Sequence, residues 1–252
     1  MKALILLGCT SAVALVSLAS DTPAPSGPTT GTGTVTGMIS WDGERPEPLE
    51  ALDIASDKSK GCCPEGEEMD KVDRTLRISE KGGIADVVLF FEPKGGKVER
   101  EIPKEPFRMD QKRCRFEPHV LVVPTGATVA YHNSDEVPHN VHTISRKNPY
   151  FNLTIAAQGK EVREIKLEEM IKVTCDIHPW MGAHIVATDD YFAKTELDGS
   201  LNVALPPGEY EVSYWHEKLG KGSFDDITVA EGGTVKIEEK LEESKGGGRR
   251  RR

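Results

Sequence analysis

Residues 175–181 bring together side chains that bind soft metal ions. Their sequence, Cys-Asp-Ile-His-Pro-Trp-Met, places a thiol, an imidazole and a thioether in one short segment, and its proline disfavours a helix there. A second imidazole is available upstream, in the sequence Pro-His-Asn-Val-His at residues 138–142. Two histidines, one cysteine and a weak axial methionine form the ligand set of blue-copper electron-transfer sites. The pattern therefore predicts one mononuclear copper ion, bound by Cys175, His178, Met181 and a histidine of the upstream segment.

The chemistry of copper explains why these residue types belong together. Thiolate and thioether donors suit Cu(I), and imidazole binds both oxidation states. We expect a strand that ends at Thr174 to deliver Cys175, the following turn to deliver the next two ligands, and the end of a neighbouring strand to deliver His139. Ligands held on a rigid β framework move little when the charge of the ion changes. Asn140, directly after His139, is expected to join the two ligand loops by hydrogen bonds, a role that tunes a metal site.

The remaining histidines are expected to be surface residues or hydrogen-bonded structural residues. In a strand, His142 would point to the opposite face from His139. His216 is expected to line a domain interface. For His119, which follows Cys114 closely, the alternative is a second metal site.

Residues 116–186 resemble the cupredoxin family. The spacing Cys-x-x-His-x-x-Met, the upstream histidine followed by Asn140, and the turn at Gly126 occur in the order seen in amicyanin and plastocyanin-like members. The resemblance implies a Greek-key β-sandwich and an electron exit route through His178, near the surface. It implies a redox partner such as a c-type cytochrome or a dehydrogenase. It also implies copper ligands at His139, Cys175, His178 and Met181.

The whole chain is similar to bacterial proteins described as methylamine-utilisation or plastocyanin-like proteins, in which a cupredoxin precedes a carboxypeptidase-regulatory-like β module. Short strands with tight turns after residue 191 agree with that module. We therefore expect an all-β protein: a cupredoxin sandwich with an N-terminal elaboration, and a small C-terminal β-sandwich. The expected segments are a signal peptide (1–20), a flexible linker (21–33), an elaborated cupredoxin domain (34–188, copper-binding core 111–188), the carboxypeptidase-regulatory-like sandwich (189–240) and a disordered basic tail (241–252).

The elaboration at residues 34–110 is expected to add strands to the first sandwich, and a separate subdomain is the alternative. At the N-terminus, one lysine and the apolar residues 3–19 predict a cleaved secretory signal, and hence a periplasmic or otherwise exported protein with no membrane span after cleavage. The alternatives are an uncleaved anchor and lipidation at Cys9.

Export places the other cysteines in an oxidising compartment, which favours a disulfide. Neighbouring cysteines do not easily bridge each other, so we expect Cys114 to pair with Cys62 or Cys63, and the sequence does not decide which.

The formal net charge of −9 argues against nucleic acid as a partner. The expected function is single-electron transfer. Copper storage, delivery or a structural copper would use the same ligands, and a non-metal interaction module is the third possibility. An enzyme is not expected, because four protein ligands leave no open position for a substrate.

Overall fold

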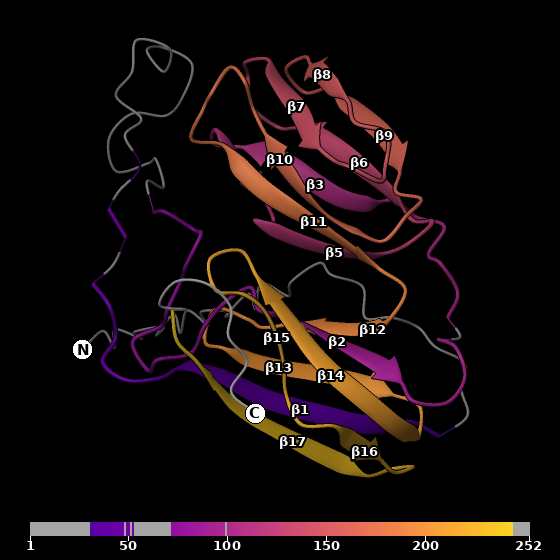
Figure 1. The fold of residues 1–252 in the computed structure, drawn as a ribbon. Helices are drawn as coiled ribbons and strands as arrows, with labels where there is room; N and C mark the ends of the chain where they lie inside the picture. Colours follow the sequence, from indigo (N-terminus) through magenta and orange to yellow (C-terminus); the bar gives the residue numbers. More distant parts are fainter. Residues whose placement is uncertain (1–30, 48, 51, 53–71, 99, 244–252) are drawn as a thin grey trace, which may run out of the picture.

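The computed structural model describes residues 31–47, 49–50, 52, 72–98 and 100–243 (Figure 1). These residues form strands β1 to β17 in four sheets, which confirms the expected all-β class. No helix long and apolar enough to cross a bilayer occurs among the described residues. The expected signal peptide, most of the linker, Cys62, Cys63 and most of the basic tail lie outside the described residues.

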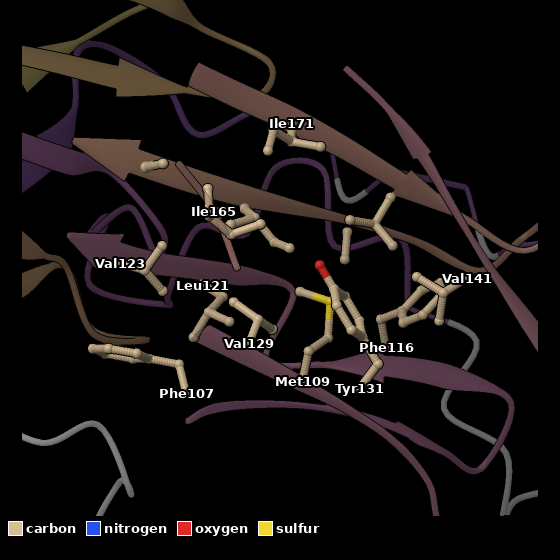
Figure 2. Packing of buried hydrophobic residues seen from close by; sticks show 14 of the residues in the cluster. Phe107, Met109, Phe116, Leu121, Val123, Val129, Tyr131, Val141, Ile165 and Ile171 are labelled. Carbon is tan, nitrogen blue, oxygen red and sulfur yellow. The ribbon is translucent and has the colours of Figure 1, made fainter. Parts of the chain in front are cut away.

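The first sandwich packs a five-stranded sheet, in the order β5-β11-β10-β7-β8, against a four-stranded sheet, in the order β4-β3-β6-β9. Its strands are β3 (Phe107–Lys112), β4 (Arg115–Glu117), β5 (Val120–Pro124), β6 (Thr128–Asn133), β7 (His139–Ile144), β8 (Asn152–Ile155), β9 (Lys160–Glu164), β10 (Glu169–Thr174) and β11 (Gly182–Thr188). Side chains alternate between the two faces of each strand. Figure 2 shows the core between the sheets, where Met109, Tyr131 and Ile171 are fully buried.

The second sandwich packs the sheet β13-β1-β17 against the sheet β12-β2-β14-β15, with β16 paired to β14. Its strands are β1 (Gly33–Trp41), β2 (Val88–Pro93), β12 (Tyr191–Lys194), β13 (Ser200–Leu205), β14 (Gly208–His216), β15 (Gly220–Ser223), β16 (Ile227–Val229) and β17 (Thr234–Leu241). Figure 1 shows the indigo β1 beside the yellow β17, from the two ends of the chain.

The expectation that residues 34–110 add their strands to the first sandwich is wrong for β1 and β2. β1 lies between β13 and β17, and β2 lies between β12 and β14. Without β1, the facing edges of β13 and β17 would be left unpaired. The buried Val35 and Ile39 of β1 also extend the core of this sandwich. Of the strands described within residues 34–110, β3 alone joins the first sandwich.

The two sandwiches contact each other through apolar side chains. Val120 and Val122 of β5 and Val186 of β11 pack against Phe90 of β2 and Trp215 of β14. Because side chains alternate along β11, Val186 and His184 face the second sandwich, whereas Ala183 and Ile185 face the core of the first.

Candidate metal centre

Three of the four predicted copper ligands converge. The Nδ1 atoms of His139 and His178 lie 2.8 Å apart, and the Sγ of Cys175 lies 3.8 Å from the Nδ1 of His178. One ligand atom from each of the three residues lies within 4.8 Å of the others. The fourth residue, Met181, belongs to the same loop, and all four are at most 2% exposed. Two imidazoles and a thiol facing one point form a donor set that suits copper.

Strand pairing explains this convergence. β10 ends at Thr174 and pairs with both β7 and β11, so the start of the loop lies beside the strand that begins at His139. Within the loop, the N–H of Cys175 donates to the carbonyl of Met181 at 3.2 Å, and the N–H of Met181 donates to the carbonyl of His178 at 2.9 Å. These bonds close the loop, in which Cys175, His178 and Met181 are buried whereas Asp176 and Ile177 are exposed.

The hydrogen bonds expected for Asn140 are present. Its Oδ1 accepts from the backbone N–H of Asp176 at 2.7 Å and of Ile177 at 3.3 Å. Its own carbonyl accepts from the Nε2 of the buried Gln111 at 3.0 Å. Asn140 therefore ties β7 to the loop that follows β10.

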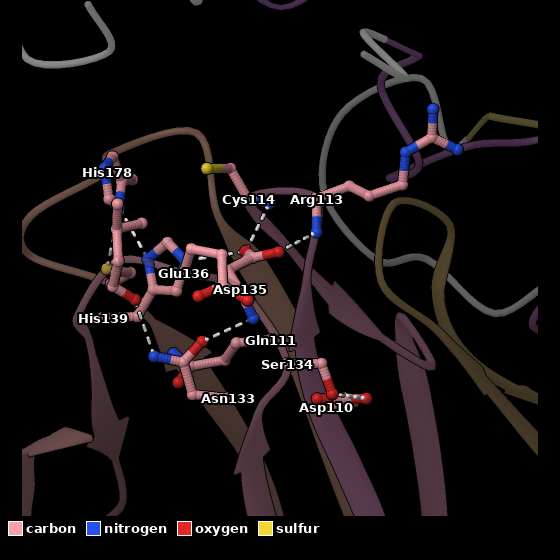
Figure 3. A network of polar contacts seen from close by, with 12 residues as sticks. Asp110, Gln111, Arg113, Cys114, Asn133, Ser134, Asp135, Glu136, His139 and His178 are labelled. Atoms are coloured by element: carbon pink, nitrogen blue, oxygen red, sulfur yellow. Dashed lines mark hydrogen bonds and ion pairs between the residues drawn. The ribbon is translucent and has the colours of Figure 1, made fainter. Parts of the chain in front are cut away.

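Asp135 is a site residue that sequence reasoning missed. Its Oδ2 lies 2.8 Å from the Nε2 of His139, and its carboxylate accepts from the N–H groups of Arg113 and Cys114 at 2.6 and 2.8 Å (Figure 3). Burial would raise the pKa of Asp135, but these hydrogen bonds lower it. For His139, burial would lower the pKa, but its contacts with Asp135 and Cys175 raise it. With Nε2 bonded to a carboxylate, Nδ1 is the ring nitrogen that His139 could offer to a metal ion.

The Cys175 thiol is easily deprotonated. Burial would raise its pKa, but hydrogen bonds from His139 and His178 lower the pKa of Cys175 to about 6. The thiolate, which is the metal-binding form, therefore predominates at neutral pH.

The side chain of His178 is only 1% exposed and so does not itself reach solvent, and its expected role as an electron exit route stays a prediction. The Trp180 ring packs against it with a centroid distance of 5.2 Å. The Nε1 of Trp180 donates to the carbonyl of Cys114 at 3.2 Å, which holds the ring over the site. As expected, His142 points away, and its Nδ1 lies 2.9 Å from the carboxylate of Asp176.

Cys114 is fully buried and is not a free thiol, whereas Cys175 is free. The bridge to Cys62 or Cys63 stays a prediction, because both lie outside the described residues.

No protein-family model and no curated protein matches the chain. Solved structures match about a third of it. A copper-containing nitrite reductase from Thermus scotoductus SA-01 matches with a TM-score of 0.33 and 21% identity over 40% of this chain and 26% of that chain. A purple cupredoxin from Nitrosopumilus maritimus matches with a TM-score of 0.29 and 22% identity over 32% of this chain and 99% of that chain. A Cu(I) form of an amicyanin mutant matches with a TM-score of 0.31 and 21% identity over 35% of this chain and 87% of that chain. The chain spans about a quarter of the length of the nitrite reductase. The chain thus resembles the three structures over part of its length. At these identities and TM-scores, its function does not follow from them.

Proposed function

We propose that this chain binds one copper ion through His139, Cys175, His178 and Met181, and that it carries single electrons between redox partners. The observation that carries the proposal is the meeting of two imidazole nitrogens and one thiol, all buried, where the loop after β10 lies beside the start of β7. Copper bound to such donors supplies one-electron redox chemistry.

Each neighbouring residue has a definite task in this proposal. Cys175, with its lowered pKa, offers a thiolate at neutral pH. Asp135 accepts the Nε2 proton of His139 and so directs the Nδ1 lone pair toward the ion. Asn140 holds the loop in place through two backbone amides, which limits movement between redox states. Trp180 limits the access of water.

We further infer a carrier and not an enzyme, because four protein donors would fill the site and leave no position for a substrate. Its partner would be a redox protein such as a c-type cytochrome or a dehydrogenase, met after export to the periplasm or beyond. We also propose that the second sandwich resembles carboxypeptidase-regulatory-like modules.

The test is the visible spectrum of the copper-loaded, oxidised protein. We expect one copper per chain, an intense thiolate-to-Cu(II) absorption band, and full reversal of that band on reduction and reoxidation. Cys175→Ser should abolish the band. His132→Gln is the matched control, because it also removes one imidazole. It should keep the band, since His132 lies in β6 and the charged groups that act on it are Arg108, Asp110 and Lys160, none of them a predicted ligand. Tight copper binding without colour or reversible oxidation would contradict electron transfer and indicate storage or delivery.

A further inference from the structure

Two imidazoles and a carboxylate meet where the two sandwiches contact each other. The Nε2 of His119 lies 2.6 Å from the Oε2 of Glu217, and the Nδ1 of His184 lies 3.5 Å from the same oxygen. One ligand atom from each residue lies within 4.8 Å of the others. None of the three is a predicted copper ligand, and their cluster contains no sulfur.

Three separate strands bring these residues together. β5 runs parallel to β11 with Val120 opposite His184, so His119, just before β5, lies beside His184. The N–H of His184 donates to the carbonyl of His119 at 2.8 Å, which fixes their spacing. Glu217 comes from the second sandwich, directly after the end of β14.

The cluster is sheltered from solvent. His119 and His184 are 8% and 9% exposed, and the side chain of Glu217 is 19% exposed. The Trp215 ring lies 5.2 Å from the His184 ring on one side. A carboxylate in such surroundings is costly unless a cation or strong donors compensate its charge. Burial would raise the pKa of Glu217, yet its contacts with the two histidines hold it well below its usual range. The carboxylate therefore stays ionised.

One polar atom of the cluster has no hydrogen bond. The Nδ1 of His184 is buried without a hydrogen-bond partner within the described part of the chain. Its 3.5 Å approach to Glu217 is an ion-pair contact and too long for a good hydrogen bond. Buried nitrogens are normally satisfied, so this orphaned atom, aimed at a carboxylate beside another imidazole, points to a missing ligand.

We propose that His119, His184 and Glu217 bind a divalent transition-metal ion of the zinc type, which links the first sandwich to the second. Nitrogen and oxygen donors of this kind suit Zn²⁺, with bonds of about 2.0–2.2 Å. Tetrahedral bonds of that length put donor atoms roughly 3.3 Å apart. The observed separations of 2.6 and 3.5 Å bracket this value, so small side-chain movements suffice. Three protein donors leave one position for water.

The test uses the full chain with Cys175→Ser, so that the probe metal cannot bind to a thiolate at residue 175. After treatment with a chelator, this protein is titrated with Co²⁺ and Zn²⁺. We expect one Co²⁺ per chain, with visible d–d bands but no thiolate charge-transfer band, and competition by Zn²⁺. Loss of a residue that only hydrogen-bonds a metal ligand weakens metal binding by roughly 10–100-fold. Because His184 and Glu217 would bind the metal directly, adding His184→Gln or Glu217→Gln should weaken Co²⁺ binding by more than that.

His132→Gln in the same background is the matched control and should leave the affinity unchanged. Zn²⁺ should raise the melting temperature of the Cys175→Ser protein but not that of its Glu217→Gln derivative. His119→Gln provides a third removal of a donor, and only variants with an unchanged circular dichroism spectrum are compared. Crystals soaked in Zn²⁺ should show anomalous scattering between the three side chains.

Failure of Cys175→Ser to bind Co²⁺, or equal affinity with and without Glu217, would overturn the proposal. Because this background lacks the thiolate, the outcome does not depend on whether the loop at residues 175–181 binds copper.

Discussion

Asn140→Ala should loosen the loop that carries three of the proposed ligands. Asn140 is 4% exposed, and its Oδ1 accepts from the N–H of Asp176 at 2.7 Å and of Ile177 at 3.3 Å. Removing the acceptor from a buried donor costs about 1–3 kcal/mol. The hydrogen bond from Ile177 is long and the loop borders solvent, so we count the loss of one hydrogen bond, that from Asp176. We therefore expect the free energy of unfolding to fall by about 2 kcal/mol. In a protein of this size that lowers the melting temperature by about 4–8 °C.

The assay is urea unfolding of the metal-free protein, together with hydrogen exchange of single amides. The amides of Asp176 and Ile177 should exchange faster in the variant, whereas those of β5 should not change. Asn152→Ala is the matched control. Asn152 is exposed, and within the described part of the chain its side chain bonds only those of Asn140 and Asp176, so its loss should stay within about 0.5 kcal/mol.

Equal, small effects of the two substitutions would refute the reasoning. So would unchanged exchange at Asp176 and Ile177 in the Asn140 variant, because the loop would then be held by its own backbone bonds.

Three further perturbations test other parts of the molecule. Burial, with the charges of Glu92 and Glu168, raises the pKa of Asp190 to about 6, so ionisation destabilises the folded state as pH rises through that value. Asp190→Asn should therefore stabilise the protein at pH 7.5 by about 1 kcal/mol after allowance for solvent screening, and have little effect near pH 4; equal gains at both values in urea unfolding would contradict this. The hydroxyl of Tyr131 is buried without a hydrogen-bond partner in the described ranges, so Tyr131→Phe should stabilise by about 1 kcal/mol; a clear loss in thermal unfolding would mean that the hydroxyl has a partner, such as a buried water. Ile39→Ala in β1 should cost about 2–5 kcal/mol and speed amide exchange in β13 and β17; faster exchange in β10 instead would mean that β1 stabilises the first sandwich.

Much of the candidate metal centre follows from local sequence. Cys175, His178 and Met181 lie within one turn-forming segment, so their proximity needs no long-range folding. Asn140 follows His139 directly, and its hydrogen bonds to the next loop were expected from that position. The all-β class also follows from local pattern, because alternating apolar residues and tight turns recur along the chain.

Other features depend on which distant segments meet. Asp135 is an ordinary turn residue in the sequence, and in the structure the backbone amides of residues 113 and 114 fix its carboxylate beside His139. The near complete burial of His178 depends on Trp180, whose indole is held by a carbonyl far away in the chain. Neither the contact of Asp135 with His139 nor that of Trp180 with His178 can be predicted from sequence spacing alone.

The largest difference concerns β1, whose alternating apolar face fits the edge of either sandwich. Strand patterns specify which face is buried but not which sheet provides the partner, since hydrogen bonds along an edge are similar for every strand. Only the tertiary structure places β1 between β13 and β17. In the same way, the sequence by itself determined one compact set of donors at residues 175–181, whereas His119, His184 and Glu217 meet only because two sandwiches pack against each other.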